Sequence, residues 1–388
     1  MEHLVYLDNA ATTPLDRRVL EAMLPHLSGR RGNPSSLHAA GTSAREAVEA
    51  AREDVGALVG ASPREIFFTG GGTEADNLAI LGLARSSPAQ KRHVVISRVE
   101  HAAVRESARR LETEGFEVSW VGVDSDGLVD PAEFEGALRP DTALAAVIWA
   151  NNEVGTVQPV DELAEICARM DVPLHTDAVQ AAGRVLLDVE KVPVTTLAVS
   201  GHKLYGPQGV GALYVRRGAT VAPILYGGGQ EGGLRSGTPN VAGLVGLGEA
   251  ARLAGEELEE RVRHETWLRD EILAGVAQIP GVRVNGHREK RLSNNAHLSV
   301  EGVEAEALVL FLDSLGYAVG SGSACASGSA GHKASPVLLA MGREEQEAFS
   351  VVRITVGKDN TSEEVDGFLE AFSAAVSRLR ELSPLYTG

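Results

Sequence analysis

The segment Leu197-Ala198-Val199-Ser200-Gly201-His202-Lys203-Leu204-Tyr205-Gly206-Pro207 joins an apolar run to a turn rich in glycine and proline. A strand that ends in Ser-x-His-Lys places its lysine beside a buried element, so we expect Lys203 to point into a cleft rather than lie on the surface. In a cleft, desolvation and nearby cations depress the pKa of a lysine amine and make it nucleophilic. Ser200 and His202 flank the lysine and are candidates to hold a phosphate.

Around this segment the chain alternates short apolar runs with helical patterns, from Arg64 to about Tyr214. This alternation indicates βαβ units and a mostly parallel sheet, which is an α/β fold. The seven expected strands are 65–69, 93–97, 118–123, 144–150, 173–176, 197–200 and 211–215. The helices expected between them are 74–85, 102–114, 131–138 and 160–170.

Beyond Thr238 the pattern changes. A single long helix, from about Val241 to Ala274, is expected to link two domains. Further strands are expected at 282–285, 296–300 and 352–356, and helices at 304–315 and 363–382. We therefore predict a large domain over 13–258 and a smaller α+β domain formed by 1–12 and 259–388. Residues 316–336 are rich in Gly, Ser and Ala, and we expect most of them to form a mobile loop.

The composition excludes several classes of function. Of 388 residues, 44% are apolar, which is enough for a substantial core. Acidic residues outnumber basic ones by 53 to 36, and the net charge of −17 argues against a general binder of nucleic acid or of an anionic membrane. No leader pattern is present, and no apolar run approaches the ~20 residues that span a bilayer. We expect a soluble cytoplasmic protein.

A glycine-rich stretch from Ile66 to Asn77 runs from a short apolar strand through three glycines, the last of them Gly72, into Thr73 and a helix. The start of a helix offers unpaired N–H groups, and glycines let a ligand approach the backbone, so the stretch has the form of a phosphate cradle. It is neither a Walker loop nor a spaced G-x-G-x-x-G. A plain strand–helix turn with Thr73 as N-cap stays open.

A carboxylate follows another expected strand. Asp177 lies at the carboxyl end of a buried strand, where open α/β sheets place their ligands. A buried carboxylate needs a cationic partner, and a protonated pyridine nitrogen is one such partner. Gln180 is placed to donate to a ring oxygen. An ordinary helix N-cap aspartate is the alternative.

The chain has two cysteines, and no C-x-x-C pair suggests a metal site. Cys167 lies on an amphipathic helical pattern and is expected to be a small core residue. Cys325 lies among Gly, Ser and Ala residues that offer it no core.

Taken in order, these motifs resemble a pyridoxal-phosphate (PLP) enzyme of the aspartate-aminotransferase fold type, and within it the cysteine desulfurases of the NifS/IscS group in the class V aminotransferase superfamily. The resemblance covers nearly the whole chain. Its motifs are Tyr6–Pro14 (YLDNAATTP), Gly32–His38 (GNPSSLH), Asn151–Gly155 (NNEVG), Ser200–Lys203 (SGHK) and Arg235–Thr238 (RSGT).

The segment Ser321–Ser327 (SGSACAS) is similar to the acceptor-cysteine loop of the NifS/IscS branch, which is long and mobile. The Arg-x-Gly-x-His-Cys-Ala pattern of the other branch is absent. His332 and Lys333 lie outside the recognised motif, and we hypothesise that they favour the thiolate of Cys325.

The resemblance implies that Lys203 anchors PLP and moves the substrate proton, and that Asp177 keeps the ring nitrogen protonated. It implies that His101 is catalytic, because it stacks on the ring and helps with proton transfer. It also implies that Cys325 takes sulfur from L-cysteine as a persulfide, leaving L-alanine. The further implied roles are phosphate binding by Gly72, Thr73, Ser200 and His202, ring contacts by Asn152 and Gln180, substrate binding by Arg353 and Asn152, and contact of Thr238 with the phosphate of a second subunit.

A homodimer and a sulfur-acceptor protein, such as an iron–sulfur scaffold, are the implied partners. The alternatives are a selenocysteine lyase or an aminotransferase on the same PLP scaffold, and a non-enzymatic scaffold that binds sulfur acceptors.

Overall fold

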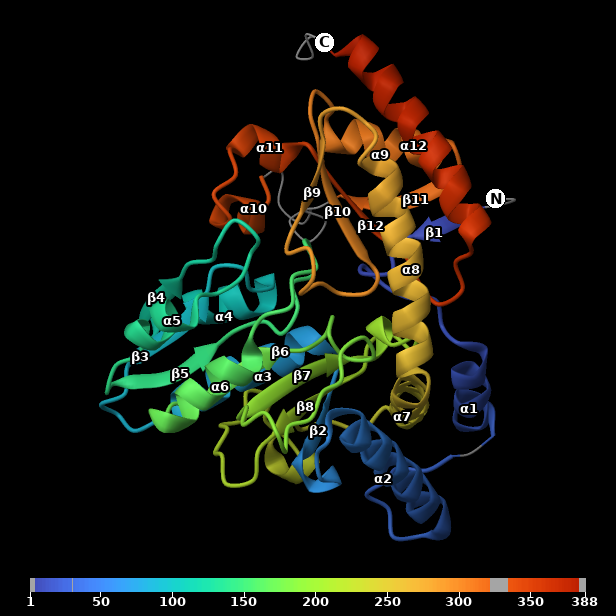
Figure 1. Ribbon diagram of the computed structural model, residues 1–388. Helices are drawn as coiled ribbons and strands as arrows, with labels where there is room; N and C mark the ends of the chain where they lie inside the picture. The colour runs from blue at the N-terminus through green and yellow to red at the C-terminus, as the bar shows by residue number, and fades with distance from the viewer. Residues whose placement is uncertain (1–3, 30, 322–333, 384–388) are drawn as a thin grey trace.

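The computed structural model describes residues 4–29, 31–321 and 334–383, and it contains two sheets, one in each half of the molecule (Figure 1). The larger sheet has seven strands in the order β2-β8-β7-β6-β5-β3-β4. Its strands are β2 Ile66–Thr69, β3 His93–Ser97, β4 Glu117–Val121, β5 Thr142–Ala146, β6 Leu174–Asp177, β7 Thr196–Ser200 and β8 Gly211–Val215. Only β8 runs against the others, which confirms the predicted mostly parallel seven-stranded sheet.

Helices cover both faces of this sheet, because its central strands are apolar on both sides. Val94 and Ile96 pack with one group of helices, and Val95 between them packs with the other. The first group is α3 (Gly72–Ser86) and α4 (Ala102–Thr113). The second includes α2 (Ala39–Val59), α5 (Pro131–Ala137), α6 (Val160–Arg169) and α7 (Val241–Glu256).

The smaller sheet has five strands in the order β1-β11-β12-β10-β9 and a core of its own. Its strands are β1 Val5–Leu7, β9 Val282–Asn285, β10 Asn295–Val300, β11 Tyr317–Ser321 and β12 Val351–Thr355. The helices that pack on it are α8 (Leu258–Val276), α9 (Ala305–Ser314) and α12 (Ser362–Leu382). The first strand of the chain thus joins strands from its last third. The domain boundaries at 12/13 and 258/259 stay a prediction.

Three further α-helices are α1 (Arg17–Ser28), α10 (Pro336–Ala340) and α11 (Glu345–Phe349). Among the described residues, no helix has an apolar stretch of the length that a bilayer crossing requires.

Three expectations differ from the structure. The strand expected at 144–150 is β5, Thr142–Ala146, and residues 147–149 are not part of a strand. The long helix expected from Val241 is two helices, which meet at Glu257, whose backbone (φ −100°, ψ 6°) is not helical and whose carboxylate binds Arg18 and Arg261. The expected loop 316–336 begins with β11, which forms because β1 and β12 pair with its two edges. Residues 322–333, with Cys325, His332 and Lys333, lie outside the described residues.

Candidate active site

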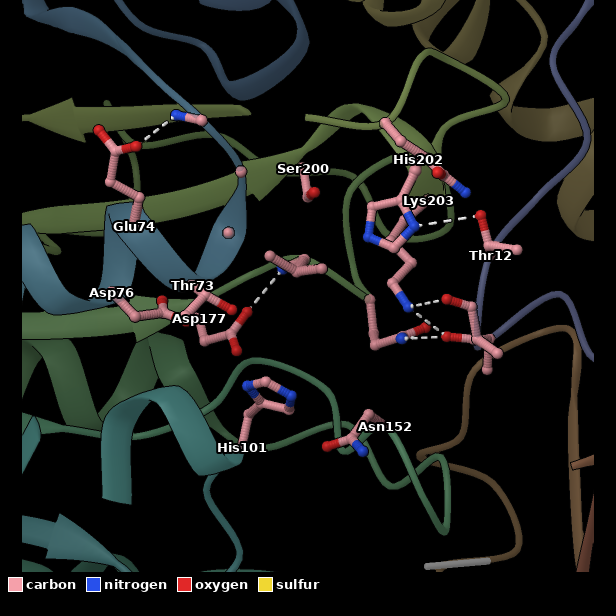
Figure 2. Close-up of a pocket in the computed structure, with 18 of the residues that line it drawn as sticks. Thr12, Thr73, Glu74, Asp76, His101, Asn152, Asp177, Ser200, His202 and Lys203 are labelled. Atoms are coloured by element: carbon pink, nitrogen blue, oxygen red, sulfur yellow. Dashed lines mark hydrogen bonds between the residues drawn. The ribbon is translucent and has the colours of Figure 1, made fainter. Parts of the chain in front are cut away.

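A cavity of about 920 Å³ opens where the carboxyl ends of the parallel strands meet the smaller sheet. Residues from both halves of the molecule line it (Figure 2). Ten residues predicted from the sequence are among them: Gly72, Thr73, His101, Asn152, Asp177, Gln180, Ser200, His202, Lys203 and Arg353. Thr238 is exposed and lines a separate hollow beside Arg235 and Asn240. Cys325 lies outside the described residues.

Lys203 lies on the short turn Gly201–Lys203 that follows β7 directly. Its Nζ donates hydrogen bonds to the carbonyl oxygens of Ala10, at 2.5 Å, and Ala11, at 2.7 Å (Figure 2). Both acceptors belong to residues 8–13, which we call the N-terminal segment. The lysine amine is therefore inside the cavity, as the sequence predicted, and a backbone segment holds it there.

The N-terminal segment contacts several other predicted residues. The Ala10 carbonyl also accepts a hydrogen bond from Gln180 Nε2 at 2.9 Å, and Thr12 Oγ1 lies 3.2 Å from His202 Nδ1. The predicted donor of Gln180 is thus engaged with the backbone, while its Oε1 is buried without a hydrogen-bond partner among the described residues. The sequence motif YLDNAATTP gave no direct sign of these contacts, which only the tertiary structure creates.

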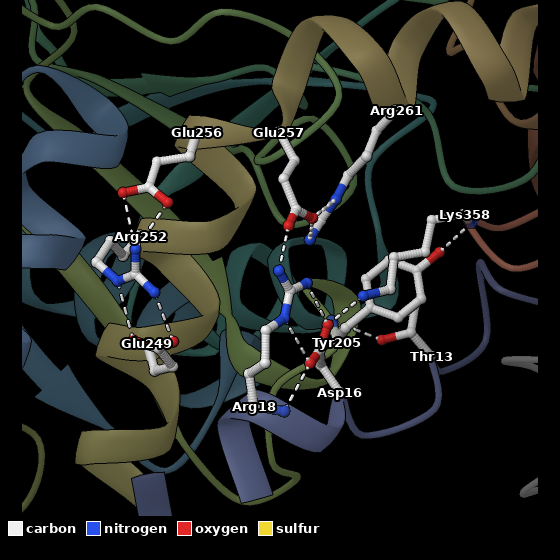
Figure 3. A network of polar contacts seen from close by, with 10 residues as sticks. All are labelled: Thr13, Asp16, Arg18, Tyr205, Glu249, Arg252, Glu256, Glu257, Arg261 and Lys358. Carbon is white, nitrogen blue, oxygen red and sulfur yellow. Dashed lines mark hydrogen bonds and ion pairs between the residues drawn. The ribbon is translucent and has the colours of Figure 1, made fainter. Parts of the chain in front are cut away.

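The turn after Lys203 is fixed from both halves of the molecule (Figure 3). Tyr205 has φ +63°, an uncommon value for a residue with a side chain. Its N–H donates to Thr13 Oγ1 at 2.8 Å, and its hydroxyl accepts from the N–H of Lys358 at 2.8 Å. The ring also lies 4.7 Å from Lys358 Nζ and 5.2 Å from the Arg261 guanidinium. These contacts offset the backbone strain and limit the positions open to Lys203.

Buried acids lie at the inner end of the cavity. Asp177 ends β6, and its Oδ1 accepts a hydrogen bond from the N–H of Val179 at 2.9 Å. Burial raises its pKa, which the nearby His101 opposes. Asp76 and His101 each place a polar atom within 4.8 Å of Asp177. Burial, and then the Asp177 charge, raise the pKa of Asp76, which also lies 3.2 Å from His175 Nε2. A cation placed here relieves the repulsion between these carboxyls.

The start of α3 borders the same cavity and offers a place for an anion. Gly71 has φ +146°, which favours glycine, and a side-chain carbon there would meet nothing within 4 Å. Gly72 begins the fifteen-residue helix α3, with Thr73 one position further, so Gly71 and not Thr73 is the N-cap. The helix start favours a bound anion. Burial, and then Lys203, lower the pKa of His202 to about 4, so its imidazole is neutral at pH 7.

Arg353 reaches the cavity from the middle of β12. Its Nη1 donates to the carbonyl of Asn152 at 2.8 Å, and its Nη2 donates to Asp8 Oδ1 at 2.8 Å. The side chain is 3% exposed. The predicted carboxylate-binding arginine is thus buried, and a protein carboxylate already contacts it.

Comparisons with known proteins agree with this geometry. Residues 5–368 match the aminotransferase class-V family. The chain belongs to this family. It is 48% identical over 385 residues to "Cysteine desulfurase IscS" of Neisseria meningitidis, covering 98% of this chain and 94% of that protein. It is 44% identical over 381 residues to the protein of the same name from Methanosarcina thermophila, with the same coverage of 98% and 94%.

Solved structures give the same result. A "NifS-like protein" superposes with a TM-score of 0.91 at 38% identity, covering 97% of this chain and 100% of that one. "SspA in complex with cysteine" superposes with a TM-score of 0.81 at 34% identity, covering 92% and 99%. Enzymes of this family use PLP, and the predicted fold class and cofactor are confirmed.

The residues of the cavity fit PLP. Asp177 offers a buried carboxylate for a protonated ring nitrogen, Lys203 offers an amine for the aldehyde, and Gly71, where a side-chain carbon would meet nothing within 4 Å, offers open backbone for the phosphate. Asp76 and Asp8 could not be singled out from the sequence, because Asp76 differs in no local way from a helix-surface acid and Asp8 has no local feature that points to the cavity.

Proposed function

We propose that this protein is a PLP-dependent cysteine desulfurase that converts L-cysteine to L-alanine and moves the sulfur to Cys325 as a persulfide. The convergence of Lys203, Asp177 and His101 on one cavity carries the proposal. The name "cysteine desulfurase" on relatives that match 98% of the chain supports the same activity.

When bound, PLP supplies an aldehyde for the substrate amine and a ring that accepts electrons from the substrate's Cα. The amine of Lys203 would anchor the cofactor through this aldehyde and would serve as the base that accepts the Cα proton of the substrate. Asp177 would hold a protonated ring nitrogen, and His101 would contact the ring and help with proton transfer. Arg353 binds the carboxylate of the substrate, and Asn152 also contacts the substrate. Gly72, Thr73, Ser200 and His202 would hold the phosphate, and Gln180 would contact the ring.

The sulfur step belongs to Cys325. Its thiolate attacks the substrate sulfur, so that a sulfur–sulfur bond forms while the bond between sulfur and Cβ breaks. The electron pair of that broken bond stays with the carbon fragment, which is protonated and leaves as alanine. Cys325 keeps the extra sulfur and passes it to an acceptor thiol.

We infer from the resemblance to the NifS/IscS cysteine desulfurases that the protein is a homodimer. In a homodimer, Thr238 reaches the phosphate bound by the second subunit, which accounts for its exposed position outside the cavity. The acceptor is a protein such as an iron–sulfur scaffold, and the compartment is the cytoplasm.

The second cysteine of the chain, Cys167, provides a matched control for testing the role of Cys325. Cys167 is the other cysteine, and burial raises the pKa of its thiol to about 12, so it holds almost no thiolate at pH 7. We expect Cys325→Ala to stop sulfide release and persulfide formation while the cofactor absorbance stays unchanged. Cys167→Ala should retain both activities.

The measurement is mass spectrometry of the protein after addition of L-cysteine, together with sulfide, alanine and keto-acid assays. A persulfide on Cys167, or normal sulfide release by Cys325→Ala, contradicts the assignment. Keto acid in place of alanine indicates an aminotransferase.

A further inference from the structure

A row of side chains crosses the smaller sheet and includes Arg353. Asn285 on β9 is paired with His297 on β10, which is paired with Arg353 on β12. Arg353 is paired in turn with Gly320 on β11. Asp8, directly after β1, continues the row past Gly320, because Leu7 is paired with Val319. Paired residues point to the same face of a sheet, so Arg353 lies between His297 and Asp8.

The glycine in this row leaves the space through which Asp8 and Arg353 meet. A side-chain carbon on Gly320 would lie 2.6 Å from Asp8 Oδ1 and 3.0 Å from Arg353 Nη2. The distance to Asp8 is too short for a real contact and the distance to Arg353 is unusually tight, so a larger residue at this position would displace the ion pair. The pair joins the smaller sheet's first strand to β12 across 345 residues of sequence.

The Arg353 guanidinium has N–H donors that neither Asp8 nor Asn152 uses. A guanidinium has five N–H donors. One goes to Asp8 and one to the Asn152 carbonyl, and the Nε–H is buried without a hydrogen-bond partner among the described residues. A substrate carboxylate can therefore bind two N–H groups while Asp8 stays in place.

The flank opposite Asp8 is uncharged. His297 is fully buried, and burial, and then the charge of Arg353, lower its pKa to about 3. Its Nδ1 lies 3.1 Å from Asn285 Nδ2. A neutral imidazole does not attract the guanidinium, so within the row Asp8 alone supplies a charge that orients Arg353.

We propose that Asp8 is a positioning residue that fixes the Arg353 guanidinium for the carboxylate of an amino-acid substrate. The inference rests on the proposed function only in taking the substrate to be an amino acid. With Asp8 in place the guanidinium is oriented before substrate arrives, and binding does not have to order it. Without this carboxylate the buried cation turns toward other acceptors and presents fewer N–H groups to the cavity.

Asp8→Asn tests the proposal because it keeps the shape of the side chain and removes its charge. The holoenzyme is titrated with L-alanine and, separately, with ethylamine, which has the amine but no carboxylate, and the absorbance of the bound cofactor reports binding. We expect L-alanine to bind about tenfold more weakly to Asp8→Asn, with ethylamine binding unchanged. Gly320→Ala should reproduce this selective loss by displacing Asp8.

Asp141→Asn is the matched control, because Asp141 also pairs with an arginine, Arg139, and lies outside the cavity. It should bind both ligands as the unmodified protein does. In an Arg353→Ala background, Asp8→Asn should change L-alanine binding by less than about twofold, because the two residues act through one another.

Equal losses for L-alanine and ethylamine would show a merely structural role for Asp8 and overturn the proposal. Unchanged binding of L-alanine to Asp8→Asn would also overturn the proposal. Tighter binding would overturn it too, because it would mean that Asp8 competes with the substrate for Arg353. The titration needs no desulfuration. If the proposed function is wrong, the unmodified protein releases no sulfide from L-cysteine. If only the role of Asp8 is wrong, the unmodified protein still releases sulfide normally.

Discussion

The two sheets supply the cavity in different ways. The seven-stranded sheet contributes Asp177 and Lys203 from the ends of neighbouring parallel strands, where each side chain sits in a short motif of its own. The five-stranded sheet contributes Arg353 from the middle of a strand, and its charged partner Asp8 lies 345 residues away. Asp177 and Lys203 therefore lie in turns that short motifs specify, whereas the Arg353–Asp8 pair depends on strand register. Variants of the two sheets should consequently fail in different ways.

The largest effect is expected for Lys203→Ala in the larger sheet. Loss of the amine removes both the cofactor anchor and the proton acceptor, so turnover should fall by at least ~10³-fold. The absorbance of lysine-bound PLP should also disappear. Sulfide assays and visible spectra measure both, with Lys191→Ala as a control, because the Lys191 side chain is 79% exposed. Normal turnover in Lys203→Ala would refute the site.

Arg353→Ala in the smaller sheet should leave the cofactor spectrum intact and raise KM for L-cysteine by about 100-fold, because two charge-assisted hydrogen bonds to the carboxylate are lost. Steady-state kinetics measure KM for L-cysteine and visible spectra measure bound cofactor, and both are compared with the same measurements on Lys203→Ala. If Arg353→Ala released the cofactor while KM stayed the same, the division of labour between the sheets would be wrong.

Gly72→Ala should weaken PLP binding by about tenfold, because the new carbon would lie 2.7 Å from Val179 Cγ2. Val179 donates its N–H to Asp177, so its displacement also moves that carboxylate. Equilibrium dialysis or a fluorescence titration with PLP measures the change. Gly136→Ala is the control, because a carbon on that helical glycine meets nothing within 4 Å. Equal affinities in the two variants would argue against the cradle.

The smallest effect concerns Glu153, which lies between the two sheets and accepts a hydrogen bond from Ser335. Burial raises its pKa to about 7 from the ordinary 4.5. A raised pKa means that its contribution to stability is present below pH 4.5 and is lost as pH rises through 7. Glu153→Gln should remove this loss and flatten the pH dependence of Tm by about 2–4 °C across that interval.

Thermal unfolding between pH 4.5 and 8 measures the effect of Glu153→Gln. An exposed glutamate, Glu165, provides the comparison variant Glu165→Gln. A Tm slope that Glu153→Gln leaves unchanged would mean that this carboxyl titrates alike in the folded and unfolded chain.

The same contrast explains what the sequence could predict. Strands β3 and β8 were predicted with their observed bounds, because both are short apolar runs between turn residues. The strand β11 was missed, because Gly320 and Ser321 look like loop residues until β1 and β12 pair beside them. The break between α7 and α8 was missed for a similar reason. Glu257 is a good helix former, and only its contacts with Arg18 and Arg261 distinguish it.

Pairing of the first strand with a late one has a consequence for biosynthesis. Val5 is paired with Tyr317, and the carbonyls of Ala10 and Ala11 bind the Lys203 amine. While a ribosome is still translating, the opening residues have no sheet to join, because contacts of such long sequence separation form last. A nascent polypeptide that has not yet reached β11 therefore lacks the partner strand of β1, which brings the N-terminal segment to Lys203.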